Sequence, residues 1–305
     1  MENFAGKVVV ITGGAGGLGR EFANTAFANG MKIVLADVEG NALEQAATEL
    51  RGQGAEVLSM LCDVRKGPQV QALADAAMKR YGAVHLVFNN AGVGSGGLIW
   101  ENSEADWEWV LGVNLWGVIH GTRIFTSLML ECAQNDPGFE GHIVNTASMA
   151  GLLNAPTMGV YNVSKHAVVS LSETLFHDLQ LVGAPIGASV LCPYFVPTGI
   201  SQSHRNRPAD VKMAQQPTIS QLAAQAMTQK AVESGKVSAQ EVSQMTFDAI
   251  KAGQFYIYSH PDALAGVAER MDEIVNHRNP GDPYRAMPQI RDRLRAKLNQ
   301  EQESK

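Results

Sequence analysis

Short apolar runs alternate with longer stretches of helical periodicity along most of the chain. Most of these runs are continuously hydrophobic, as in Val8-Val9-Val10-Ile11, and do not alternate between apolar and polar positions. Continuous runs are typical of strands that helices cover on both faces. The succession of strand and helix therefore predicts βαβ units and a doubly wound parallel α/β sheet. The seven strand candidates span residues 7–12, 32–37, 56–62, 86–89, 142–147, 187–192 and 255–258.

The region from residue 199 to residue 253 interrupts this alternation. Up to residue 237 it is polar and rich in Gln and Met, and Pro208 and Pro217 break any continuous periodicity. We expect residues 199–253 to supply lid or substrate-loop helices inserted in one domain that spans residues 1–305. Residues 260–305 are expected to form a helical C-terminal extension of that domain, ending in a charged helix.

Two helices are predicted inside the inserted region. Apolar residues recur at helical spacing from Ile219 to Met227, and Thr218 is placed to cap the helix. The second helix begins at a capping box formed by Ser238 and Glu241 and ends near Gly253. The residues expected on its buried face are Val242, Met245 and Ala249.

Composition and charge argue against several classes of protein. The net charge of −6 gives no sign of the basic face that nucleic-acid-binding proteins present, so no nucleic-acid partner is expected. The first residues carry no secretion signal, and the run from Val8 to Ile11 is too short to cross a membrane. We therefore expect a cytoplasmic protein without a membrane partner. The three cysteines and eight histidines show no metal-ligand spacing, so no metal is expected.

The turn after the first strand is rich in glycine and reads Thr-Gly-Gly-Ala-Gly-Gly-Leu-Gly from Thr12 to Gly19. The helix that follows has no acidic residue in its first turn, and a helix N-terminus offers unpaired N–H groups and a partial positive charge. Glycine also lets the backbone approach a phosphate closely. The turn therefore predicts a dinucleotide pyrophosphate site. Its glycines fit two registers, one with Gly13, Gly17 and Gly19 and one with Gly14, Gly16 and Gly19.

Asp37 ends the second predicted strand, about 20 residues after the glycine turn. A carboxylate at this position binds the adenosine ribose hydroxyls and repels a 2′-phosphate. No Arg or Lys lies between Asp37 and Arg51, so the sequence offers no nearby cation for NADP. NAD is accordingly the predicted cofactor, and NADP is disfavoured.

Tyr161 and Lys165 lie four residues apart in a helical stretch, so that both side chains share one face. A nearby ammonium favours the phenolate, and the sequence therefore predicts that Lys165 lowers the pKa of Tyr161 for general base catalysis. Ser148 follows the fifth predicted strand, at the edge of the sheet where α/β sites assemble. It is placed to donate a hydrogen bond to a substrate oxygen.

These motifs, in this order and at this spacing, resemble those of the short-chain dehydrogenase/reductase family. The resemblance selects the register Gly13-x-x-x-Gly17-x-Gly19, and Asn89-Asn90-Ala91-Gly92 is similar to the sequence that closes the family's fourth strand. It implies a Rossmann-type fold and a catalytic tetrad of Asn114, Ser148, Tyr161 and Lys165. The cofactor-binding residues that it implies, with Asp37, are Gly13, Gly17, Leu18, Gly19, Asp63, Val64, Asn90, Ala91, Gly92, Tyr161, Lys165, Pro193, Val196 and Thr198.

The resemblance also implies a reaction. Tyr161 would exchange a proton with the hydroxyl of a secondary alcohol while hydride passes between the carbinol carbon and the nicotinamide. Ser148 would hold the substrate oxygen, Lys165 would also bind the nicotinamide ribose, and Asn114 would support a water chain. The family further implies a homodimer or homotetramer. One departure stands out, because Tyr194 replaces a glycine of the family and tyrosine resists the positive φ that glycine permits.

Three stretches are expected to surround the substrate, and they are mainly apolar. They predict a neutral, ring-containing secondary alcohol or ketone. The expected wall consists of Leu98, Ile99, Trp100, Met149, Leu152, Leu153, Met158, Tyr194 and Phe195, with Ser95, Ser148 and Asn154 as polar anchors. Direct substrate contacts are assigned to Ser148, Leu153, Asn154, Tyr161, Tyr194 and Phe195. If His204, Arg205 and Arg207 instead folded inward, they would form an anion clamp and favour a carboxylated substrate.

Two alternatives remain open at this stage. The chain could be a non-catalytic NAD-binding redox sensor that signals through its C-terminal extension, although the complete tetrad argues against that role. It could also use the same fold for an epimerase or dehydratase reaction.

Overall fold

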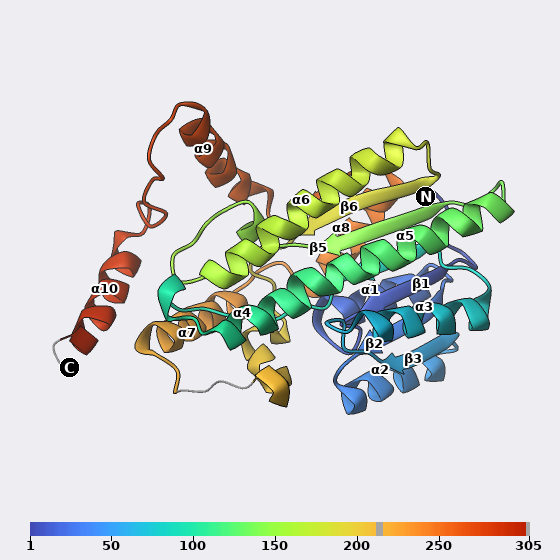
Figure 1. Ribbon diagram of the computed structural model, residues 1–305, viewed down its shortest axis with the longest axis horizontal. Coiled ribbons are helices and arrows are strands. Elements are labelled where there is room, and N and C mark those ends of the chain that lie inside the picture. The colour runs from blue at the N-terminus through green and yellow to red at the C-terminus, as the bar shows by residue number, and fades with distance from the viewer. Residues whose placement is uncertain (212–215, 303–305) are drawn as a thin grey trace.

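The predicted strands form one parallel sheet of seven strands in the order β3-β2-β1-β4-β5-β6-β7. The structure is a computed structural model that describes residues 1–211 and 216–302 (Figure 1). The predicted doubly wound α/β fold is confirmed, and each strand lies within two residues of its expected bounds. The strands are β1 (Val8–Thr12), β2 (Lys32–Asp37), β3 (Val57–Leu61), β4 (Leu86–Asn89), β5 (Gly141–Thr146), β6 (Ile186–Cys192) and β7 (Tyr256–Tyr258).

Helices cover both faces of the sheet. Val9 and Ile11 of β1 pack on one face with helices α1, α2 and α8, whereas Val8 and Val10 pack on the other with α3, α5 and α6. In Figure 1 α5 and α6 cross the front of the sheet, and α8 lies behind it. Burial on both faces explains why the strands are continuously hydrophobic. These helices are α1 (Gly17–Ala28), α2 (Gly40–Gly52), α3 (Gly67–Tyr81), α5 (Gly117–Asn135), α6 (Gly159–Leu181) and α8 (Ala239–Lys251).

The helices predicted in the inserted region are present with the expected caps. α7 (Ile219–Glu233) begins at Thr218, and α8 begins at Ser238, each with a complete capping box. Of the residues expected along one face of α8, Val242 and Ala249 are buried, whereas Met245 at the edge of that face is 40% exposed. The buried face of α8 includes Val242, Phe247 and Ala249. Phe247 packs against the sheet beside α1.

α8 thus belongs to the layer that covers the sheet, although it lies inside the range expected to form the lid. Its Ser243 Oγ donates to the Glu21 carbonyl of α1 at 3.0 Å. The part of the inserted region that stands over the carboxyl edge of the sheet comprises α7 and two short 3₁₀ helices, η4 (Gly199–Asn206) and η5 (Ala209–Val211). We use the term lid for residues 199–211 and 216–233.

The C-terminal extension leaves the body of the molecule. Its helices α9 (Leu264–Val275) and α10 (Pro288–Gln302) extend away from the sheet in Figure 1. α9 has no buried residue, while Leu294 of α10 is buried where α10 packs against α7. Of the helices in the described ranges, none is long and apolar enough to cross a membrane.

Candidate active site

The glycine turn lies where the strand order reverses, between β1 and β4. Parallel sheets of this kind bind ligands at this point, outside the carboxyl ends of the strands. Gly13 and Gly17 have positive φ values of 66° and 54°. A Cβ at Gly19 would lie 2.0 Å from the Gly13 carbonyl oxygen, whereas a Cβ at Gly16 would meet nothing within 4 Å. The backbone therefore requires glycine at the three positions of the register that the resemblance selected.

The first turn of α1 suits a phosphate group. No side chain caps its N-terminus, and no acidic residue lies in its first turn. Gly16, Gly17 and Leu18 at this helix end line the cavity. The first N–H groups of a helix have no partner within the helix and can bind an anion. These residues fit the pyrophosphate of a dinucleotide.

The loops after β1 and β4 are held together by hydrogen bonds. Thr12 Oγ1 accepts from the backbone N–H groups of Asn90 and Ala91 at 2.9 and 3.1 Å. Asn90 Nδ2 donates to the Thr12 carbonyl at 3.0 Å. Thr12 was not among the predicted site residues, although its place at the start of the glycine turn could have identified it.

Asp37 lies at the end of β2 and lines the same cavity as the glycine turn. Its carboxylate accepts from the N–H groups of Ala15 and Glu39, at 3.0 and 3.1 Å. Burial raises the pKa of Asp37 above its ordinary value, and these backbone hydrogen bonds offset part of the rise. The carboxylate is therefore fixed in direction beside the turn, where a ribose hydroxyl would meet it.

Asp63 and Val64, predicted to contact adenine, follow β3. The Asp63 carboxylate binds Arg65, whose Nη2 lies 2.8 Å from Oδ2. Arg65 also reaches Asp210 of the lid at 3.4 Å. Sequence reasoning missed Arg65 because its partner in the lid is 145 residues away. Val64 is largely buried, because α5 packs closely on it at Gly117.

Ser148, Tyr161 and Lys165 lie together at the carboxyl ends of β5 and β6. Tyr161 and Lys165 come from the first turns of α6, and Ser148 caps a short 3₁₀ helix, η3 (Met149–Gly151). Burial raises the pKa of Tyr161 to about 12, and a hydrogen bond with the Ser148 hydroxyl offsets part of the rise. The two hydroxyl groups therefore lie near each other, as a shared substrate oxygen would require.

Lys165 is almost completely buried, and its Nζ donates to the Thr146 carbonyl at 2.8 Å. Burial lowers the pKa of Lys165 to about 8. Its Nζ lies 5.6 Å from the centre of the Tyr161 ring. The net lowering of the Tyr161 pKa expected from Lys165 is not observed here, because burial of the phenol is the largest cause of the shift and raises the pKa.

Asn114 lies behind these residues in a π-helical turn, η2 (Gly112–Trp116), between α4 (Glu104–Leu111) and α5. Its Oδ1 accepts from the Val93 N–H at 2.8 Å, and its Nδ2 donates to the Val93 carbonyl at 3.0 Å. Nδ2 also donates to Ser164 Oγ at 3.1 Å. Asn114 therefore ties the loop after β4 to α6. Inserted π turns of this kind are frequent at functional sites.

One cavity of about 1900 Å³ contains nearly all of the predicted site residues. This volume exceeds the range usual for a single small ligand and has room for a dinucleotide and a substrate. Of the predicted residues, Gly19 and Asn114 lie outside its wall and support the residues that form it. The predicted residues that line it are Gly13, Gly17, Leu18, Asp37, Asp63, Val64, Asn90, Ala91, Gly92, Ser148, Leu153, Asn154, Tyr161, Lys165, Pro193, Tyr194, Phe195, Val196 and Thr198.

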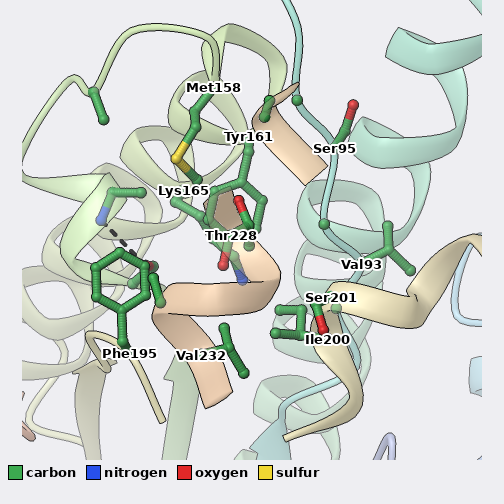
Figure 2. Close-up of a pocket in the computed structure, with 18 of the residues that line it drawn as sticks. Val93, Ser95, Met158, Tyr161, Lys165, Phe195, Ile200, Ser201, Thr228 and Val232 are labelled. Carbon is green, nitrogen blue, oxygen red and sulfur yellow. Dashed lines mark hydrogen bonds between the residues drawn. The ribbon is translucent and has the colours of Figure 1, made fainter. Parts of the chain in front are cut away.

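The wall around Tyr161 differs from the expected one. Figure 2 shows Tyr161 and Lys165 behind the turn of α7 that carries Thr228, with Met158 and Phe195 to one side and Val93 and Ser95 to the other. Thr228 and Val232 were missed, although their spacing of four residues places both on one face of α7. Ile200, which ends the stretch 194–200 expected around the substrate, was not named in the expected wall but lines the cavity.

Four residues expected in this wall do not line the cavity. Trp100 is 76% exposed, and Ile99 packs outside, against Gly159 at the start of α6. Leu98 lies next to them, and Leu152 packs with the apolar residues near β7 and α9. For Leu98, Ile99 and Trp100 the prediction failed because the chain forms the short helix η1 (Ile99–Glu101) outside the cavity wall, and Leu152 packs into a separate apolar cluster.

The residue that replaces the family glycine causes no backbone strain. Tyr194 is not among the non-glycine residues with positive φ, which in the described ranges are Thr157 and His277. Its ring packs on Phe195 with centroids 4.3 Å apart, and its N–H donates to Ser259 Oγ at 3.0 Å. Tyr194 thus joins the cavity wall to the segment after β7.

His204, Arg205 and Arg207, the residues of the anion clamp considered above, line the cavity, but the two arginines are paired with carboxylates. Arg205 binds Glu39 at 2.7 Å, and Arg207 binds Asp106 at 2.5 Å. His204 is exposed. Both guanidinium groups are thus engaged by carboxylates. Three or more His, Cys, Asp or Glu residues do not gather into a metal site anywhere in the described part of the chain.

Comparison with known proteins gives one consistent result. The family model described as short chain dehydrogenase matches residues 7–209, which is about two thirds of the chain. A solved short-chain dehydrogenase/reductase from Burkholderia phymatum, in complex with NAD, shares 55% identity and superposes with a TM-score of 0.90. That likeness covers 93% of this chain and 99% of the solved chain.

Two curated relatives match along almost their whole length. A CLA biosynthesis dehydrogenase/reductase from Lactiplantibacillus plantarum is 32% identical over 92% of this chain and 97% of its own. A C alpha-dehydrogenase from Sphingobium sp. is 31% identical over 95% of this chain and 93% of its own.

Proposed function

This chain belongs to the short-chain dehydrogenase/reductase family and is an NAD(P)-dependent oxidoreductase, and we propose that it interconverts a secondary alcohol and its ketone with NAD(H). The observation that carries the proposal is the placement of Ser148, Tyr161 and Lys165 in one cavity with the glycine turn and Asp37. When bound, the nicotinamide supplies the hydride acceptor or donor. The protein's own residues then have to position the carbinol and move one proton.

We assign that proton to Tyr161. In alcohol oxidation the substrate hydroxyl gives its proton to the phenolate oxygen as the carbinol C–H bond breaks, and the carbonyl forms. In reduction the phenol returns the proton to the carbonyl oxygen. The Ser148 hydroxyl, which lies near Tyr161 in the same cavity, would hold the same substrate oxygen. Lys165 lies below the ring and would bind the nicotinamide ribose, while Asn114 would hold the loop after β4 in place for a proton-carrying water chain.

We propose NAD as the preferred cofactor because Asp37 faces the position of the adenosine ribose. Its carboxylate would accept from the ribose hydroxyls and repel a 2′-phosphate. The other residues that we propose to contact the cofactor are those that the resemblance to the family implies.

We propose a mainly apolar, ring-containing substrate without multiple negative charges. The wall near Tyr161 combines Met158, Phe195, Ile200 and Val232 with few polar groups, of which Ser95 and Asn154 are examples. The pairing of Arg205 and Arg207 with carboxylates supports this choice over a carboxylated substrate. We also propose that the active form is a homodimer or homotetramer.

A screen of alcohols with NAD and of ketones with NADH, followed by NADH absorbance, tests the proposal. Turnover of secondary alcohols supports it. Tight NAD binding with no turnover of any carbinol or ketone would instead indicate the redox-sensor alternative. Product formation without a net change in NADH would indicate an epimerase or dehydratase.

The substrate class is tested by comparing kcat/KM for a neutral aryl alkyl carbinol with that for a short 3-hydroxy acid. The apolar wall predicts that the carbinol is the better substrate. A clear advantage for the acid would overturn the proposed substrate class while leaving the reaction itself intact.

A further inference from the structure

The lid brings a guanidinium group to the end of β2, a contact that the sequence does not reveal. Arg205 Nη2 lies 2.7 Å from Glu39 Oε1, and Arg205 Nε donates to Glu39 Oε2 at 3.2 Å. The two residues are 166 positions apart. Glu39 follows Asp37 by two residues, and its N–H binds the Asp37 carboxylate at 3.1 Å. Asp37, Glu39 and Arg205 line the same cavity.

Arg205 is held firmly on the lid side. Its Nη1 donates to the carbonyl groups of Gly199 and Gln202, at 3.2 and 3.0 Å. Gly199 follows Thr198, whose side chain lies against Gly17 of the glycine turn. The guanidinium group is therefore held beside Gly199 on the lid side of the cavity that also contains Gly17 and Asp37.

Within the described residues, the hydrogen bonds that the Glu39 carboxylate accepts all come from the lid. Besides Arg205, its Oε1 accepts from Asn206 Nδ2 at 2.7 Å. The hydrogen bond from Arg205 lowers the pKa of Glu39 below its ordinary value, so the pair is charged at neutral pH. Both side chains are partly exposed, at 44% for Arg205 and 29% for Glu39. Such a pair contributes little to global stability, and its substitution should leave the fold intact.

We propose that Glu39 is a second determinant of cofactor choice, which acts by occupying and neutralising Arg205. The proposal rests on the NAD preference proposed above. A 2′-phosphate on the adenosine ribose would meet the carboxylate of Asp37, and the Arg205 guanidinium group, which lines the same cavity, is already committed to Glu39. Without these two carboxylates, the planar guanidinium becomes free to bind a phosphate through two hydrogen bonds. Arg205 is then a residue for cofactor specificity, and its pairing with Glu39 prevents it from binding a 2′-phosphate.

The test is a set of variants measured by binding, without turnover. Calorimetry gives Kd for adenosine 2′,5′-bisphosphate and for AMP in Asp37→Ser, in Asp37→Ser with Glu39→Gln, and in that double variant with Arg205→Gln. Adding Glu39→Gln should tighten bisphosphate binding about tenfold or more, the worth of one hydrogen-bonded charge pair. Adding Arg205→Gln should abolish that gain. AMP binding should change little along the series.

Glu44→Gln in the Asp37→Ser background is the matched control. It removes the same charge from α2, but Glu44 binds Arg51 and not the lid. A gain of similar size in this control, or a gain that persists without Arg205, would overturn the proposal, because net charge alone would then explain it. No gain on adding Glu39→Gln would overturn it as well.

The same experiment separates this proposal from the function on which it rests. If the wild-type protein bound the bisphosphate as tightly as it binds AMP, the assigned role of Asp37 would fail first. If Asp37→Ser relaxed the selectivity and Glu39→Gln added nothing, only the role of Glu39 and Arg205 would fail.

Discussion

The two halves of the cavity are built in different ways. On the cofactor side, the loops after β1 and β4 are joined by hydrogen bonds between side chains and backbone, as in those from the N–H groups of Asn90 and Ala91 to Thr12 Oγ1. These loops stand on strands that are completely buried. On the lid side, residues 199–211 are held through side chains, by the ion pairs Arg205–Glu39, Asp210–Arg65 and Arg207–Asp106.

This difference matters for function. A site fixed by buried strands and by hydrogen bonds between their loops keeps its geometry, which hydride transfer to a cofactor requires. A segment held by a few ion pairs opens at lower free energy and accepts substitutions more readily. We therefore expect the sheet side to determine the reaction, and the lid side to determine which ligands enter.

The largest effect should come from the sheet side, with Tyr161→Phe. The ring and its packing survive while the proton carrier is lost, so kcat should fall about 100-fold or more. Kd for NADH, measured by fluorescence, should stay near the wild-type value. A variant that keeps more than about a hundredth of the wild-type kcat would show that another group moves the proton.

For Lys165→Met we expect smaller effects, on kcat and on Kd for NADH together. Because Lys165 is assigned both to the proton carrier and to the nicotinamide ribose, kcat should fall and Kd for NADH should rise, each by about tenfold or more. Lys79→Met, on the exposed side of α3, is the control and should alter neither. An unchanged Kd in Lys165→Met would remove its assignment to the ribose.

The lid side is tested with Asp106→Asn. Arg207 and Asp106 have side-chain exposures of 10% and 6%, and Arg207 would be left buried without an anionic partner. The cost of breaking such a buried pair is about 3 kcal/mol. We expect faster hydrogen exchange in residues 199–211 and a higher KM for the cofactor, with protection of the sheet unchanged.

Glu108→Gln, on the exposed side of the same helix, is the control for that experiment. Equal loss of protection in the lid and in β1, β4 and β5 would show that the two halves open as one unit. The contrast drawn between them would then be wrong.

The most gradual effect should be a loss of unfolding free energy as the pH falls, caused by a buried histidine of the sheet. Burial in β5 lowers the pKa of His142 to about 3, and its Nε2 lies 2.8 Å from Ser189 Oγ. Between the ordinary histidine pKa and 3, the unfolded chain binds a proton that the folded chain does not. His142 therefore costs stability as the pH falls below about 6.5, by about 1.4 kcal/mol per pH unit.

Chemical denaturation of the wild type and of His142→Gln between pH 7 and pH 4 measures this effect. The variant should show a shallower loss of unfolding free energy as the pH decreases. Parallel curves would mean that His142 takes up its proton in the folded state.

The sequence by itself determined the fold and identified most of the residues that line the candidate site, because their signals are local. Continuous apolar runs specify strands that are covered on both faces. Gly13, Gly17 and Gly19 are required by the backbone, and a spacing of four residues places Tyr161 and Lys165 on one face of a helix. Each of these signals depends on a few consecutive residues, and no distant segment has to be known.

The tertiary structure alone decided the rest, because it depends on which distant segments meet. It placed Arg205 on Glu39, put Thr228 and Val232 of α7 in front of Tyr161, and turned Trp100 out to solvent. Burial, which is a property of the whole fold, also raised the pKa of Tyr161, whereas the local spacing predicted a lower value. Local spacing fixes which groups are neighbours along a helix, but desolvation and long-range pairing set their charge and their partners.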